Sequence, residues 1–160
     1  MWFDVCFLRY DNFSFFSDLD AHVISILKNP QTVKDNQAGF QNDVMDLLRP
    51  LTGENSDLAR KGLAAESATS SSSDTPRVFG LVECWRNLPI EECKSCLSIA
   101  LKNLYPSMVK EGGEALLGSC RIRFETYSFS TLFPSNATTH QTYPFSTLFP
   151  SNATVHQSNV

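Results

Sequence analysis

Apolar residues along the chain recur at two spacings, which together predict two helices among several strands. One set has helical spacing and predicts an amphipathic helix over residues 40–51: Phe40, Val44, Leu47, Leu48 and Leu51. A second set predicts a helix from Pro89 to about Leu104: Ile90, Cys93, Leu97, Ala100, Leu101 and Leu104. Pro89 suits a helix start, and Glu91 and Glu92 are favourable in the first turn.

Shorter apolar stretches predict the strands. Residues 77–85 indicate a buried strand, and residues 114–117 and 120–129 indicate two more, antiparallel and preceded by a turn at Gly112-Gly113. An edge strand is expected near residues 63–65. The order helix, strand, helix, strand, strand predicts an α+β fold with its helices on one face of the sheet.

Four of the five cysteines, Cys84, Cys93, Cys96 and Cys120, lie close together in the sequence. Such a group is typical of two disulfides, a zinc site or a redox centre. Zinc favours cysteine pairs separated by two to four residues, and only Cys93 and Cys96 fit. A thioredoxin-type exchange pair needs a βαβ pattern, which is not seen here. The favoured interpretation is two structural disulfides, with zinc and redox chemistry as the alternatives.

The same cysteines carry a family resemblance. Cys84-x8-Cys93-x2-Cys96 is followed by Gly112-Gly113 and by Cys120-x-x-Arg-Phe-Glu. This pattern, over about residues 36–127, resembles the plant cysteine-rich domain called stress-antifungal or ginkbilobin-homologous. That domain occurs in tandem in the ectodomains of cysteine-rich receptor-like kinases and in cysteine-rich repeat secretory proteins.

The resemblance implies a structure: two helices packed on an antiparallel sheet and stapled by disulfides, with a short strand through residues 28–33. It also implies the pairing of Cys84 with Cys93 and of Cys96 with Cys120. The family's third disulfide has no counterpart, because Met108 stands at one of its positions and no cysteine occurs between Cys6 and Cys84. Methionine is apolar and adaptable, so Met108 is expected to fill that space and to be buried.

The resemblance further implies a function as a non-catalytic extracellular recognition module in stress or defence, with a carbohydrate or an apoplastic protein as ligand. Family members bind mannose through an Asn, an Arg and a Glu. Glu125 matches the Glu, Glu114 stands in the place of the Arg, and the Asn has no matched position. The alternative is a truncated remnant, or a zinc-stabilised intracellular structural domain, without a ligand of its own.

Internal repeats divide the chain. The segment from Cys6 to Phe15 repeats the pattern from Cys120 to Phe129, at a separation of 114 residues. Residues 1–16 are therefore expected to be the C-terminal remnant of a preceding cysteine-rich domain, 17–35 a linker with the incoming strand, and 36–129 the stress-antifungal domain. Cys6 is left as an unpaired thiol through which another chain could associate. Residues 127–142 recur at 143–158 with thirteen of sixteen positions identical, and 130–160 are expected to be a disordered Ser/Thr/Pro tail.

Little in the chain indicates other chemistry. No nucleophile elbow, phosphate loop, HExxH motif or kinase signature is present, so no enzyme, cofactor or metal is expected. A net charge of −4 gives no indication of nucleic-acid binding, and no apolar run is long enough to span a membrane. No signal peptide is visible in this chain, yet three glycosylation sequons, at Asn12, Asn136 and Asn152, fit an extracellular location.

Overall fold

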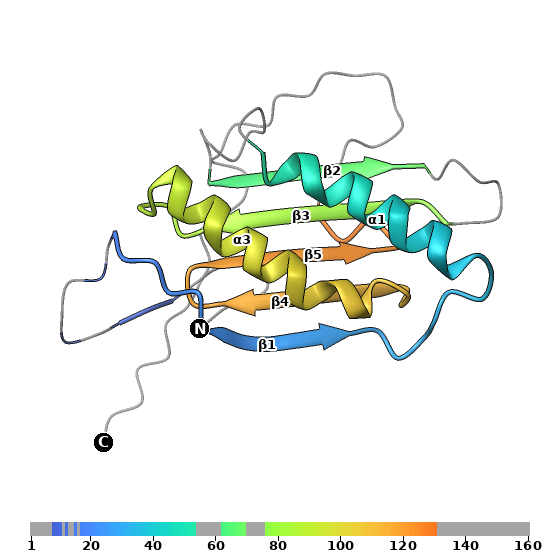
Figure 1. Ribbon diagram of the computed structural model, residues 1–160, viewed down its shortest axis with the longest axis horizontal. Helices are drawn as coiled ribbons and strands as arrows, with labels where there is room; N and C mark the ends of the chain where they lie inside the picture. Colours follow the sequence, from blue (N-terminus) through green and yellow to red (C-terminus); the bar gives the residue numbers. More distant parts are fainter. Residues whose placement is uncertain are drawn as a thin grey trace, which may run out of the picture.

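The computed structural model describes residues 8–10, 12, 15, 17–53, 62–69 and 76–130. Two α-helices cover one face of a five-stranded antiparallel sheet with the strand order β1-β4-β5-β3-β2 (Figure 1). The strands are β1 Val23–Lys28, β2 Leu63–Ala68, β3 Val78–Cys84, β4 Gly112–Leu117 and β5 Cys120–Glu125. The helices are α1 Gln37–Leu51, α3 Ile90–Leu104 and the short 3-10 helix η1 Tyr105–Ser107.

Both predicted helices and the α+β class are confirmed. Helix α1 begins three residues earlier than its apolar stripe, because Asn36 caps it: the Asn36 side chain accepts a hydrogen bond from the Gly39 N–H at 3.2 Å. Pro50 lies in the last turn of α1, where the helix ends one residue later. Helix α1 packs over β3 and β2, and α3 packs over β4 and β5.

The core lies between the helices and the sheet. Alternate residues of β5, namely Cys120, Ile122 and Phe124, are fully buried towards the helices. The Phe124 ring packs at a tilt against Phe40 of α1, with 6.5 Å between the ring centroids. This alternation leaves Arg121, Arg123 and Glu125 on the opposite face of the sheet, which we call the outer face.

The expected burial of Met108 is confirmed, since its side chain is 0% exposed within the apolar core. Backbone hydrogen bonds place the incoming segment beside it. The Val33 N–H donates to the Val109 carbonyl at 3.0 Å, and the Glu111 N–H donates to the Gln31 carbonyl at 3.1 Å. Met108 therefore occupies the core at the point where this segment enters the domain.

The expected edge strand near residues 63–65 is confirmed as β2, but the strand that the resemblance implied through residues 28–33 is wrong. The strand β1 comes earlier, at Val23–Lys28, and forms the other edge of the sheet. After Lys28, Asn29 accepts a hydrogen bond from the Gln31 N–H at 2.9 Å, and Pro30 has no N–H to donate. Only an isolated bridge between Thr32 and Lys110 follows.

The turn predicted at Gly112-Gly113 is also wrong, because both glycines are the first residues of β4. A Cβ on Gly113 would lie 3.0 Å from the Phe124 ring, and one on Gly112 would meet the Glu125 side chain. The glycines are needed for close packing within the sheet. The last strand is shorter than predicted and ends at Glu125, after which the chain turns back over the outer face.

Candidate functional site

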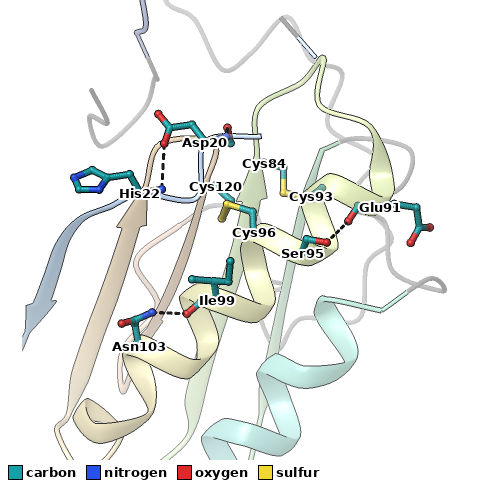
Figure 2. The surroundings of a disulfide bond; sticks show 11 residues. Asp20, His22, Cys84, Glu91, Cys93, Ser95, Cys96, Ile99, Asn103 and Cys120 are labelled. Atoms are coloured by element: carbon teal, nitrogen blue, oxygen red, sulfur yellow. Dashed lines mark hydrogen bonds between the residues drawn. A yellow bond between two sulfur atoms is a disulfide. The ribbon is translucent and has the colours of Figure 1, made fainter. Parts of the chain in front are cut away.

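The two disulfides lie together at one end of the sheet (Figure 2). Cys84 at the end of β3 is directly opposite Cys120 at the start of β5. Cys93 and Cys96 are neighbours on α3, and each reaches one of these strands. The structure joins Cys84 to Cys93 and Cys96 to Cys120, with Cα–Cα distances of 5.8 and 6.1 Å, as the resemblance implies.

This pairing decides among the three alternatives that the cysteine spacing left open, namely two disulfides, a zinc site and a redox centre. All four sulfur atoms are used in disulfides, so none is a thiolate that could bind zinc or carry out redox exchange. Among the residues that the structure describes, no group of three or more His, Cys, Asp and Glu side chains is arranged to hold a metal ion. The cysteines fasten α3 to two strands of the sheet.

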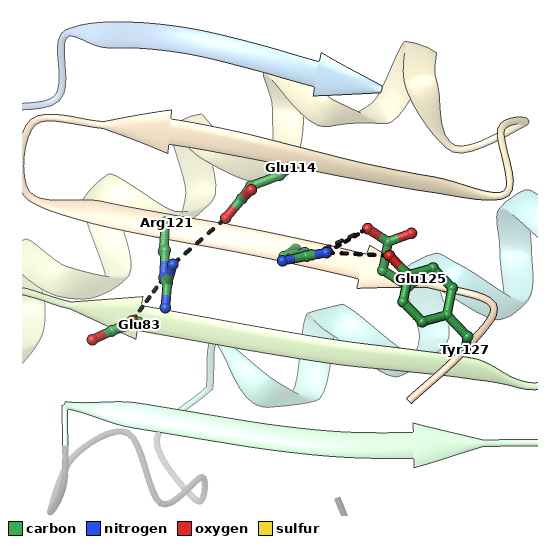
Figure 3. A network of polar contacts seen from close by, with 6 residues as sticks. Glu83, Glu114, Arg121, Glu125 and Tyr127 are labelled. Atoms are coloured by element: carbon green, nitrogen blue, oxygen red, sulfur yellow. Dashed lines mark hydrogen bonds and ion pairs between the residues drawn. The ribbon is translucent and has the colours of Figure 1, made fainter. Parts of the chain in front are cut away.

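Ionic side chains from three strands meet on the outer face (Figure 3). Arg121 of β5 lies between two carboxylates: its Nε is 2.7 Å from Glu83 of β3, and its Nη1 is 3.8 Å from Glu114 of β4. All three side chains are at least two-thirds buried. Glu114 is therefore paired with a guanidinium from the neighbouring strand.

Arg123 and Glu125 form a second cluster two residues further along β5. The Arg123 Nη2 and Nε donate to the Glu125 Oε1 at 2.9 and 3.1 Å. The same Nη2 lies 3.5 Å from the Tyr127 hydroxyl, and the guanidinium carbon lies 4.3 Å from the centre of the Phe129 ring. Arg123 is thus held in one place by a carboxylate, a phenol and an aromatic face.

Glu125 is unusually buried for a strand-surface carboxylate, at 8% exposed. Its second oxygen, Oε2, lies beside Gly112, where the missing side chain leaves it room. Burial raises the pKa of Glu125, and the hydrogen bond and charge of Arg123 offset this only in part. Burial lowers the pKa of Arg123, but the hydrogen bond and charge of Glu125, together with the charges of Glu114 and Tyr127, outweigh it, so that the pKa of Arg123 is raised.

The structure brings some of the predicted site residues together and separates others. Glu125 and Glu114 both lie on the outer face, but they bind different arginines. Asn12 is exposed, as a glycosylated residue has to be. Cys6, Asn136, Asn152 and the tail beyond Ser130 lie outside the described residues.

Sequence reasoning missed Arg123, Tyr127 and Gly112 as members of the site. Arg123 was visible, because a residue two positions before Glu125 on a strand shares its face. Tyr127 lies beyond the end of β5 and is 53% exposed, so its contact with Arg123 depends on how the chain turns. Gly112 carries no side-chain chemistry, and its role depends on a neighbour in the next strand.

Among the residues that the structure describes, no helix is both long enough and apolar enough to cross a membrane.

The family described as salt stress response/antifungal matches residues 27–127 of this chain. The chain is 34% identical, over 131 residues, to an antimicrobial ginkbilobin-2-like protein of Castanea crenata, covering 81% of this chain and 52% of that protein. It is 31% identical over 131 residues to cysteine-rich repeat secretory protein 38 of Arabidopsis thaliana, covering 81% and 50%.

The chain is also similar to part of larger proteins. Cysteine-rich receptor-like protein kinase 5 of Arabidopsis thaliana is 32% identical over 128 residues, which are 79% of this chain and 19% of the kinase. The crystal structure of the tandem DUF26 ectodomain of an Arabidopsis thaliana cysteine-rich receptor-like protein matches with a TM-score of 0.56 at 22% identity, covering 72% of this chain and 50% of that chain. The chain spans about half the length of the ginkbilobin-2-like protein and of cysteine-rich repeat secretory protein 38. It belongs to the salt stress response/antifungal family of cysteine-rich domains.

Proposed function

We propose that this chain is a non-catalytic extracellular recognition module that binds a carbohydrate at the carboxyl end of β5. The observation that carries the proposal is the cluster of Arg123, Glu125 and Tyr127, which fixes hydrogen-bond donors and acceptors in one place. Sugar hydroxyls both donate and accept, so a guanidinium, a carboxylate and a phenol suit them. Groups that are already held in place lose little freedom when a ligand binds.

Glu114 has the opposite charge to the Arg that the family resemblance implies at its position. In β4, Glu114 is directly opposite Arg123 of β5, and Arg123 binds Glu125. A guanidinium is therefore present beside the Glu125 carboxylate, although it comes from β5 and not from the position after the glycine pair. Oε2 of Glu125 fills the space that Gly112 leaves open, so the carboxylate is held on this side by Gly112 and on the other by Arg123.

An extracellular location, with a role in stress or defence, is supported by three observations. Two disulfides are buried in the core, and such bonds persist in oxidising compartments. Asn12, in a glycosylation sequon, is exposed. The similar proteins include one named as antimicrobial, one named as secretory and the ectodomain of a receptor-like protein.

We also propose that residues 1–16 are the C-terminal part of another unit of the same family. Arg9 and Phe15 are the positions that the repeat equates with Arg123 and Phe129. The Arg9 guanidinium lies 4.4 Å from the centre of the Phe15 ring, against 4.3 Å for the second pair. The same arginine–aromatic contact in both segments favours a common origin, and the tandem ectodomain of the relative supports it.

Calorimetric titration with mannose and with manno-oligosaccharides tests the carbohydrate proposal. Wild-type protein is expected to bind, and Glu125→Gln is expected to lose affinity at least tenfold, or about 1.4 kcal/mol, because it removes a charged acceptor. Glu83→Gln is the matched control, since Glu83 is also an outer-face carboxylate paired with an arginine. Equal loss in both variants, or no binding by wild type to any of these sugars, would overturn the carbohydrate proposal and favour a remnant without a ligand.

A further inference from the structure

A groove runs between α1 and α3, on the side of the sheet away from the outer face. The two helices lie side by side over the sheet (Figure 1). The groove is lined by Met45 of α1 and, from the other side, by Ser98, Leu101, Lys102 and Tyr105, and its volume is about 270 Å³. On the α3 side the lining residues recur at i, i+3, i+4 and i+7, so they form one continuous stripe of the helix surface.

The chemistry of this groove is apolar. The stripe of α3 that faces the sheet is a different one, namely Cys93, Cys96, Leu97, Ala100 and Leu104. Leu101 and Tyr105 therefore present a second apolar surface that the sheet does not cover, and Tyr105 is 48% exposed. An apolar cavity of about 150 Å³ accommodates benzene, so this groove has room for a phenyl ring with an aliphatic neighbour.

The chain itself contains a segment with the matching chemistry. Thirty residues follow Ser130, and none of them is Asp, Glu, Lys or Arg. The apolar triplet Leu-Phe-Pro occurs there twice, at 132–134 and at 148–150. We propose that the second triplet, Leu148-Phe149-Pro150, binds in the groove between α1 and α3 of its own chain, with the Phe149 ring against Met45 and Leu101.

The point where the described chain ends decides between the two triplets. Strand β5 ends at the same end of the molecule as α3 (Figure 1). Gly113 is paired with Phe124 near the end of β5, and a Cβ on Gly113 would lie 3.2 Å from Leu104, the last residue of α3. Phe129, however, packs on Arg123 and is therefore on the outer face, with the sheet between it and the helices. The chain has to pass around the sheet and a helix about 10 Å across before it reaches the groove.

The first triplet is too close to make this passage. Phe133 is three residues after Ser130, and three extended residues span about 10 Å. Phe149 is nineteen residues after Ser130, and nineteen residues span up to about 60 Å. Only the second copy of the repeat has the reach, although the two copies have the same sequence from Phe to Thr.

The chain offers a direct test, because it contains only three methionines. Met45 lines the groove, while Met108 is 0% exposed in the core and serves as an internal reference. NMR spectra of the full chain with ¹³C-methyl methionine report on both. Phe149→Ser is expected to shift the Met45 methyl resonance, because the field of the aromatic ring is lost, and to leave Met108 unchanged.

Phe133→Ser is the matched control, since it makes the same change in the same triplet at a position that cannot reach the groove. It is expected to leave Met45 unchanged. The proposal is overturned if Phe149→Ser has no effect on Met45, or if both variants shift it equally. A Phe149-dependent shift that disappears on dilution would assign the triplet to a second molecule and would overturn binding within one chain.

Discussion

Replacement of Gly112 by alanine should destabilise the domain, although the same change in an ordinary strand stabilises it. Gly112 is directly opposite Glu125 in the β4–β5 pair. A Cβ at this position would lie 2.6 Å from the carboxylate carbon of Glu125, which is closer than two such atoms can approach. Either the carboxylate or the strand has to move.

The loss of stability in Gly112→Ala depends on the interactions that hold the Glu125 carboxylate in place. A glycine in a strand costs roughly 0.5–1 kcal/mol relative to alanine, which would favour the substitution. Overpacking costs about 1–3 kcal/mol, and displacement of Glu125 also weakens its hydrogen bonds of 2.9 and 3.1 Å to Arg123. We expect a net loss of about 2 kcal/mol in the free energy of unfolding of Gly112→Ala.

Equilibrium unfolding in urea of a double-mutant cycle measures this directly. In the Glu125→Ala background the obstacle is gone, so Gly112→Ala should become neutral or stabilising, with a coupling energy of about 1–2 kcal/mol. Gly113→Ala is the control, because its Cβ would meet Phe124 and Leu104 on the other face of the sheet and Glu125→Ala cannot relieve it. If the two changes are additive within about 0.5 kcal/mol, Gly112 does not make room for Glu125.

Three further outcomes are expected. Removing one disulfide by Cys96→Ala with Cys120→Ala opens a loop of 24 residues and should cost about 3 kcal/mol in urea unfolding; a loss below about 1 kcal/mol would contradict a structural role. Burial raises the pKa of Glu125 above 4.5, so the folded state keeps a proton that the unfolded state releases. The free energy of unfolding should therefore fall as the pH rises from about 4.5 through the folded-state pKa of Glu125, and Glu125→Gln should flatten that part of the profile. Met108→Ala should cost about 2–5 kcal/mol in thermal unfolding, and a neutral result would show that Met108 does not fill the core.

The spacing of apolar residues in the sequence was sufficient to predict those elements whose conformation depends little on residues far along the chain. The helices α1 and α3 were predicted from their apolar stripes, because a helix satisfies its own hydrogen bonds and only needs one face to bury. Strand β3 was predicted from a run of apolar residues with the same extent to within one residue at either end. In each case the local pattern and the tertiary environment favour the same structure.

The predictions that were wrong concern residues whose conformation is decided by a neighbour far along the chain. Gly112-Gly113 is typical of a turn, yet it begins a strand because Phe124 and Glu125, twelve residues or so further on, occupy the space of its side chains. Strand β1 is an edge strand that pairs only with β4, more than eighty residues later. The ionic partner of Glu114 could not be predicted either, since Arg121 reaches it only through the register of β4 and β5.

The two ends of the domain are stabilised by different kinds of interaction. At one end, two disulfides fasten α3 to β3 and β5, and they shrink the unfolded ensemble whatever the packing around them. At the other end, Met108 is buried in the apolar core, and the incoming segment is held by backbone hydrogen bonds such as that from Val33 to Val109. Packing and hydrogen bonds are lost together when a segment opens, whereas a disulfide still limits its excursion. The end that carries Met108 is also the end where β5 finishes and where Glu125 lies, so the candidate carbohydrate site is on the less constrained half of the domain.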